Sequence, residues 1–98
     1  MGKQRAGARY ARMYKLVLSD EARRIYEKAQ LPLARKLAKC FARLEADPRA
    51  GNNVRALTGP LAGRWRYRVG DHRVVYWIDD TSAIVSVVTI ANRKDVYD

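Results

Sequence analysis

A two-residue turn near the middle of the chain constrains the fold more than any other feature. Gly70-Asp71 separates two segments, residues 64–69 and 72–79, in which side chains of different character alternate. A two-residue loop with glycine in first position is typical of a tight β-hairpin, because glycine supplies the positive φ that the turn needs. The sequence therefore predicts two antiparallel strands whose pairing is fixed by the turn.

This pairing brings arginines from both strands together. The turn places Arg68 opposite Arg73, and facing residues of an antiparallel pair project from the same side of the sheet. Arg66 lies two residues before Arg68 and shares its side, and Arg64 continues the row. Like charges that face each other are unfavourable by roughly a few tenths to 1 kcal/mol, which a bound phosphate would relieve. The opposite side is expected to enter the core through Trp65, Tyr67, Val74, Tyr76 and Ile78.

Two helices are expected before the hairpin. Residues 14–19 alternate as a strand, and Ser19 suits a helix N-cap with acidic residues in the first turn. A short amphipathic helix follows, and a second helix begins with Pro32 and runs to about residue 46, before Asp47-Pro48. Its basic side carries Arg35, Lys36, Lys39 and Arg43, which we interpret as a solvated face, with a contact to ribosomal RNA as the functional alternative. Its apolar stripe is Leu33, Ala34, Leu37, Ala38, Phe41 and Leu44, and Cys40 is also expected in the core.

The remaining segments complete an α+β fold. Residues 54–57 are expected to form a short strand, and residues 83–90, rich in β-branched side chains, a longer one. The predicted order is strand, two helices, then three or four strands, with the helical hairpin on one face of an antiparallel or mixed sheet. We interpret residues 1–12 as a loosely ordered basic tail and residues 13–98 as a single domain.

Charge and composition narrow the function classes. Twenty Lys and Arg against ten Asp and Glu give a net charge of +10, which favours a polyanionic partner: RNA, DNA, an acidic protein or anionic lipid. One cysteine and one histidine exclude a disulfide within the chain and the usual zinc sites, so we expect neither metal nor cofactor. No segment is long and apolar enough for a membrane span, and no signal peptide is recognisable, so the expected location is cytoplasmic.

Basic strands have an ordinary explanation, since surface strands often carry Arg and Lys for solubility and to block edge pairing. Here the arginine row, the facing Arg73 and the overall charge agree, so we interpret the hairpin as a phosphate-binding face. Arg93 and Tyr97 follow the last strand. Near several guanidinium groups the pKa of the Tyr97 phenol would fall below its usual value of about 10, which would suit it to proton transfer.

These residues resemble the RelE/ParE toxin superfamily. The resemblance extends from Tyr14 to Tyr97, and its most specific parts are the segments WRYRVGDHRVVY and NRKDVY. It implies a toxin of a type II toxin–antitoxin system and a cognate antitoxin partner. In the RelE branch it further implies a metal-independent endoribonuclease that cuts mRNA in the ribosomal A site, through attack of the 2′-OH on the scissile phosphate, in contact with ribosomal RNA.

The resemblance also assigns candidate catalytic residues: Arg66, Arg68, Arg73, Arg93 and Tyr97. Arg64, His72 and Lys94 are expected to add contacts to RNA. The best-known members of the RelE branch have lysines where this chain has Arg66 and Arg68. Arginine binds phosphate through its planar fork but is a poor proton carrier, because its pKa lies above about 12. The general acid and base therefore stay open: Tyr97 is our choice of base, and His72 is either a second proton carrier or simply exposed.

Two other functions stay open at this stage. The ParE branch shares the fold but inhibits DNA gyrase, and it needs no ribonuclease site. A non-catalytic RNA-binding module, or a toxin that has lost its activity, would also keep the basic face. Arg93 and Tyr97 favour the ribonuclease over the ParE branch, because a toxin that cleaves no RNA has no need for them.

Overall fold

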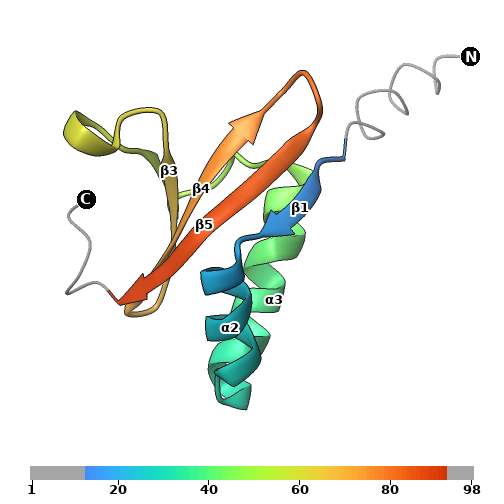
Figure 1. The fold of residues 1–98 in the computed structure, drawn as a ribbon, viewed down its shortest axis with the longest axis vertical. Helices are drawn as coiled ribbons and strands as arrows, with labels where there is room; N and C mark the ends of the chain where they lie inside the picture. Colours follow the sequence, from blue (N-terminus) through green and yellow to red (C-terminus); the bar gives the residue numbers. More distant parts are fainter. Residues whose placement is uncertain (1–12, 93–98) are drawn as a thin grey trace, which may run out of the picture.

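Five strands form one mixed sheet, and two helices cover one of its faces (Figure 1). The computed structural model describes residues 13–92, so the expected basic tail, residues 1–12, lies outside the described residues. The fold is α+β, as predicted. Its elements in chain order are β1 (Lys15–Leu18), α2 (Asp20–Lys28), α3 (Leu31–Ala46), β2 (Val54–Ala56), a 3₁₀ turn (Gly59–Leu61), β3 (Trp65–Val69), β4 (His72–Asp79) and β5 (Ile84–Asn92).

The strand order explains why both helices lie on one face. The sheet runs β1-β5-β4-β3-β2, so the two outermost strands are consecutive in the chain apart from the helices between them. The segment from β1 to β2 must cross the whole sheet, and α2 and α3 make that crossing on one side (Figure 1). β1 pairs with β5 in parallel, whereas the other pairs are antiparallel. The sheet is thus mixed, and no α-helix within residues 13–92 lies on its other face.

Local signals set the helix boundaries. The Ser19 hydroxyl accepts a hydrogen bond from the Ala22 amide at 3.0 Å, which confirms the predicted N-cap of α2, and donates to the Val88 carbonyl at 2.6 Å. This second bond ties the start of α2 to β5. Gln30 precedes α3, and Pro32 is its second residue rather than its first, where the missing amide hydrogen still costs no helical bond. No helix within residues 13–92 is long and apolar enough to cross a membrane.

The core lies between α3 and the helix-covered face of the sheet. Leu37, Leu44 and Tyr76 are fully buried, and the aromatic rings of Tyr26 and Phe41 meet edge to face with centroids 5.2 Å apart. Ala38 was expected in the apolar stripe of α3 but is exposed, because the buried stripe follows Leu37, Cys40, Phe41 and Leu44. A small side chain on the margin of that stripe loses little by facing water.

One end of the sheet is held by a group of polar contacts. Arg49 donates two hydrogen bonds to the Asp80 carboxylate, at 3.1 and 2.8 Å, and the Tyr14 hydroxyl donates to the same carboxylate at 2.6 Å. Next to this group, the buried Tyr76 hydroxyl donates to the Pro48 carbonyl at 2.6 Å. These contacts join β1, the loop after α3 and the β4–β5 turn, which are far apart in the sequence.

We predict that Tyr76→Phe lowers the free energy of unfolding by about 1–2 kcal/mol, because it leaves the Pro48 carbonyl without its buried donor. Tyr26→Phe is the matched control: it removes a hydroxyl from a ring that packs by its edge, and its effect should be smaller. Urea unfolding followed by circular dichroism measures both. Equal effects of the two substitutions would contradict the importance of the Tyr76 bond.

We predict that stability falls at alkaline pH because of Cys40. Burial raises the pKa of this thiol to about 12, whereas in the unfolded chain it lies near about 8.5. Between these values the unfolded state loses a proton that the folded state keeps, so raising the pH favours unfolding, with a slope that approaches about 1.4 kcal/mol per pH unit.

Urea unfolding of the wild type and of Cys40→Ala at pH 7, 8, 9 and 10 tests this dependence. The variant should be less stable at pH 7, because it leaves a small cavity, but its stability should fall less between pH 8 and 10. Parallel pH profiles of the two proteins would contradict the assignment.

Candidate nucleic-acid interface

The pairing of β3 with β4 follows the turn as predicted. Arg68 faces Arg73 and Val69 faces His72, and Gly70 has φ +58°. Because Tyr67 and Val74 face each other within the core, alternation puts Arg66, Arg68 and Arg73 on the helix-free face. The structure therefore brings together three of the candidate catalytic arginines. We call the helix-free side of β2, β3 and β4 the basic face.

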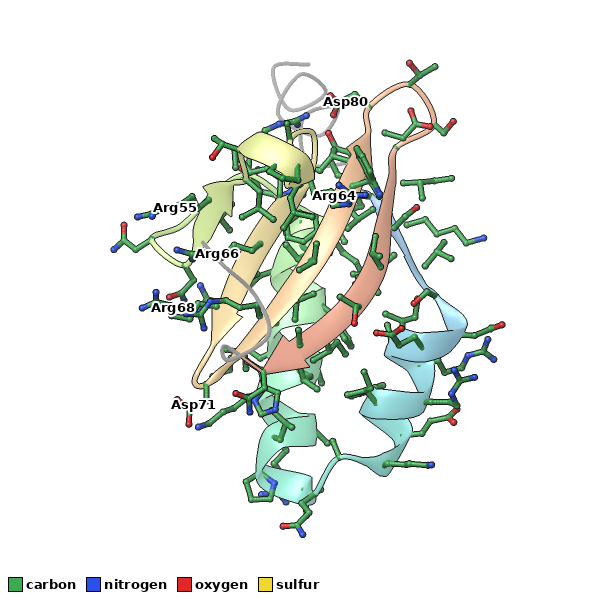
Figure 2. All side chains as sticks on the ribbon, turned by 60° about the vertical axis from the view of Figure 1, so that its left-hand side comes forward. Arg55, Arg64, Arg66, Arg68, Asp71 and Asp80 are labelled. Carbon is green, nitrogen blue, oxygen red and sulfur yellow. The ribbon has the colours of Figure 1, made fainter. Side chains whose placement is uncertain are left out.

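The basic face holds a second pair of facing arginines that the sequence analysis missed. Arg55, on the edge strand β2, lies opposite Arg66 on β3. Figure 2 shows Arg55, Arg66 and Arg68 on this side of the sheet, away from the helices. A strand of only three residues gives too few alternations to reveal its pairing partner. The apolar Val54 followed by the charged Arg55 does indicate which side of the strand faces the core, since Val54 is partly buried and Arg55 is exposed.

The arginines of the basic face differ in their exposure. Arg66 is only 3% exposed and Arg73 only 6%, whereas Arg55 and Arg68 are exposed. The Asn53 carbonyl accepts a hydrogen bond from Nη1 of Arg66 at 2.7 Å and another from the Arg68 backbone amide at 2.9 Å. The loop before β2 thereby holds the Arg66 guanidinium in one position. Nη1 of Arg73 donates to the His72 carbonyl at 3.3 Å.

Arg64 lies apart from the three strand arginines and contacts an aromatic ring. It precedes β3, and its guanidinium carbon is 4.7 Å from the ring centroid of Trp77, while Nη1 donates to the Pro60 carbonyl at 3.5 Å. Figure 2 shows Arg64 toward the end of the sheet marked by Asp80, and Arg68 toward the hairpin end marked by Asp71. Trp77 is 41% exposed, and the sequence analysis did not consider it as a functional residue.

The structure does not bring every candidate together. His72 pairs with Val69, a core residue, so alternation along β4 directs it to the opposite side from Arg73. Its expected contact with RNA therefore receives no support from the geometry. Arg93, Lys94 and Tyr97 lie outside the described residues.

The basic face is suited to binding anions rather than to moving protons. Guanidinium groups bind phosphate oxygens in a planar, bidentate manner, and they stay protonated at neutral pH because their pKa exceeds about 12. Within residues 13–92 no group of three or more His, Cys, Asp or Glu side chains is placed to hold a metal ion. Proton transfer at this face would therefore need a residue from another part of the chain or a group on the substrate.

Two helices on one face of a mixed five-stranded sheet match the fold of RelE-like toxins. Residues 13–97 match the sequence model of the family described as the ParE toxin of type II toxin–antitoxin systems, parDE, and the chain belongs to that family. The predicted resemblance to the RelE/ParE superfamily is thereby confirmed. No curated protein matches the chain at a significant level.

Solved structures agree with this fold. The YoeB/ParE toxin from Agrobacterium tumefaciens has a TM-score of 0.72 at 24% identity, over 80% of this chain and 96% of that chain. The toxin–antitoxin complex RelBE2 from Mycobacterium tuberculosis has a TM-score of 0.66 at 28% identity, over 83% of this chain and 99% of that chain. The archaeal RelE–RelB complex from Pyrococcus horikoshii has a TM-score of 0.73 at 19% identity, over 86% of this chain and 99% of that chain.

We predict that Arg68→Gln weakens the binding of single-stranded RNA without unfolding the protein. Arg68 is exposed, so the free energy of unfolding should change by less than about 0.5 kcal/mol. If Arg68 contacts one phosphate, the slope of log K against log salt concentration should fall by about 0.7. Fluorescence anisotropy with a labelled oligonucleotide at several salt concentrations measures the slope.

Arg35→Gln is the matched control, because it removes the same charge from an exposed position on α3, on the other side of the sheet. Its salt slope should equal that of the wild type. Equal losses for the two variants would mean that RNA responds to net charge alone and that the basic face is not the binding site.

Proposed function

We propose that the protein is a ribosome-dependent endoribonuclease, a toxin that cleaves mRNA in the ribosomal A site. The proposal rests on one observation above all: the pairing of β3 with β4 gathers Arg66, Arg68 and Arg73 on one face. Arginines gathered in this way can hold a phosphodiester and stabilise the extra negative charge that develops on it during cleavage.

In the proposed mechanism the RNA supplies its own nucleophile. The 2′-oxygen attacks the adjacent phosphorus, the bond from phosphorus to the 5′-oxygen breaks, and the products are a 2′,3′-cyclic phosphate and a 5′-hydroxyl. A base takes the proton of the 2′-OH, and an acid returns one to the departing 5′-oxygen. Tyr97 is the proposed base, and Arg66, Arg68 and Arg73 surround the phosphate. Arg93 assists the leaving group or stabilises charge, and no step requires a metal or a cofactor.

The same proposal includes partners and location. The solved complexes from Mycobacterium tuberculosis and Pyrococcus horikoshii pair toxins of this fold with antitoxins. By analogy, a cognate antitoxin would bring acidic or apolar residues to the exposed surfaces of this toxin and neutralise it. Messenger RNA and ribosomal RNA would be the targets, which places the protein in the cytoplasm.

Inhibition of DNA gyrase is the second candidate function, and the match to the ParE toxin family favours it. Such a toxin would need the fold but no ribonuclease site. The two functions leave different traces in cells: cuts in translated mRNA in phase with codons, or DNA damage with intact mRNA.

We predict that Arg73→Ala lowers mRNA cleavage by about 10²–10³-fold, because it removes a charge that acts on the transition state. Arg73 is buried, so circular dichroism must first show that the variant folds. The measurement is primer extension on translated messages after induced expression, with Arg35→Gln as the control that keeps activity. Full activity of Arg73→Ala would overturn the proposed site.

A second measurement tests the nucleophile. Purified toxin is added to ribosomes carrying an mRNA with a single 2′-deoxy nucleotide at the mapped cleavage position. Cutting there should disappear, since no 2′-OH remains to attack. Persistent cutting at the substituted position would refute the mechanism. DNA damage with intact mRNA in cells would instead refute the ribonuclease function and support inhibition of DNA gyrase.

A further inference from the structure

Trp77 is a large aromatic side chain exposed on the face that carries the arginines. It is 41% exposed, and the other large hydrophobic residues exposed within residues 13–92 are the aliphatic Met13, Val17 and Leu31. An indole left in water forfeits a substantial hydrophobic gain. Its neighbours on β4, Tyr76 and Ile78, point to the core instead, so the exposure follows from the alternation of the strand.

Two residues of the link before β3, Gly63 and Arg64, hold the indole in place. A Cβ atom on Gly63 would lie 2.8 Å from Cζ3 of Trp77, so the ring rests against the bare backbone of this glycine, which has φ +93°. The Arg64 guanidinium lies over the ring, 4.7 Å from its centroid. A ring held in this way is ordered by folding, so a ligand that stacks there loses less entropy than it would on a mobile side chain.

Trp77 continues the surface of the basic face. It projects from the same side of β4 as Arg73, four residues and so about 13 Å away along the strand. A short run of single-stranded nucleotides can span that distance. The face thus combines guanidinium groups for phosphates at the hairpin end with an aromatic ring and a further arginine, Arg64, toward the other end (Figure 2).

We propose that Trp77 and Arg64 form a stacking site for an unpaired base of the RNA, a few nucleotides from a phosphate bound at the basic face. Aromatic rings and guanidinium planes are the groups on which proteins stack splayed bases of single-stranded RNA. The inference rests on the proposed function in taking RNA as the ligand, and it adds a residue that influences which sequences are bound and cut. The Arg64 guanidinium over the ring and the arginines of the basic face favour a polyanion over an apolar protein surface.

Stacking can be observed directly, without cleavage. The chain has two tryptophans, so Trp65→Phe leaves Trp77 as the only indole fluorophore. Titration of this variant with a short single-stranded RNA should quench its fluorescence, because a stacked base quenches an indole. The control is an oligonucleotide with the same phosphates but abasic sugars, which should bind the arginines without quenching. Binding of the RNA without quenching, or equal quenching by both oligonucleotides, would overturn the inference.

Substitutions at position 77 separate stacking from simple apolar contact. Trp77→Ala and Trp77→Leu should each bind the RNA about 5- to 150-fold more weakly, and Trp77→Phe should recover part of the loss. Affinity for the abasic oligonucleotide should be the same for all four proteins. If Trp77→Leu binds RNA as tightly as the wild type, the site does not stack bases. If the fluorescence of Trp77 changes only on addition of an acidic protein partner, the site binds protein instead of RNA.

The two proposals can fail separately. If induced wild type leaves mRNA intact while RNA still quenches Trp77, the ribonuclease is wrong and the stacking site stands. If the wild type cuts mRNA and Trp77→Ala cuts the same codons at the same rates, the ribonuclease stands and the stacking site is wrong. If both hold, Trp77→Ala should redistribute the cuts among codons in the primer-extension map.

Discussion

The pairing of β3 with β4 is the constraint on which the rest of the molecule depends. Side chains of a strand alternate between the two faces, so a shift of one residue in this pairing would exchange the faces of the facing residues. Arg66 and Arg68 would then meet the helices, and Tyr67 would meet water. The turn at Gly70 prevents such a shift because its φ of +58° suits glycine and fixes a two-residue loop. One turn thereby sets both the core and the basic face.

The basic face is costly to assemble, and the opposite face supplies the stability that permits it. Arg55 faces Arg66 and Arg68 faces Arg73, so two like-charged pairs lie on adjacent strand pairs. Arg66 is also almost fully removed from water, and a buried guanidinium needs hydrogen-bond acceptors such as the Asn53 carbonyl. Residues fully buried between α3 and the sheet, such as Leu44 of α3 and Tyr76 of β4, offset this cost. An anion bound between the facing arginines would reduce their mutual repulsion.

The sequence could predict what local chemistry determines. The glycine turn sets the β3–β4 pairing, the Ser19 hydroxyl sets the start of α2, and apolar spacing gives most of the stripe of α3. It could not predict features that depend on distant segments: the parallel pairing of β1 with β5, the arginine on the three-residue β2, or the contact of Gly63 with Trp77. The β1–β5 pairing has no local pattern, because it forms only when the helices carry the chain across the sheet. The other two features depend on how the link between β2 and β3 folds.

Because the basic face carries arginines, the residues that could bind a phosphate differ from those that could transfer a proton. A lysine can lose its proton when its surroundings lower its pKa, whereas a guanidinium group is a poor proton carrier. The described face can therefore orient a phosphate and stabilise its charge, but it cannot start the reaction by itself. If the proposed function holds, a toxin of this fold that kept the arginines and lost its proton carrier would bind RNA without cutting it. The cleavage activity of such a toxin thus depends more on the proton-carrying groups that reach the basic face than on the arginines of the face.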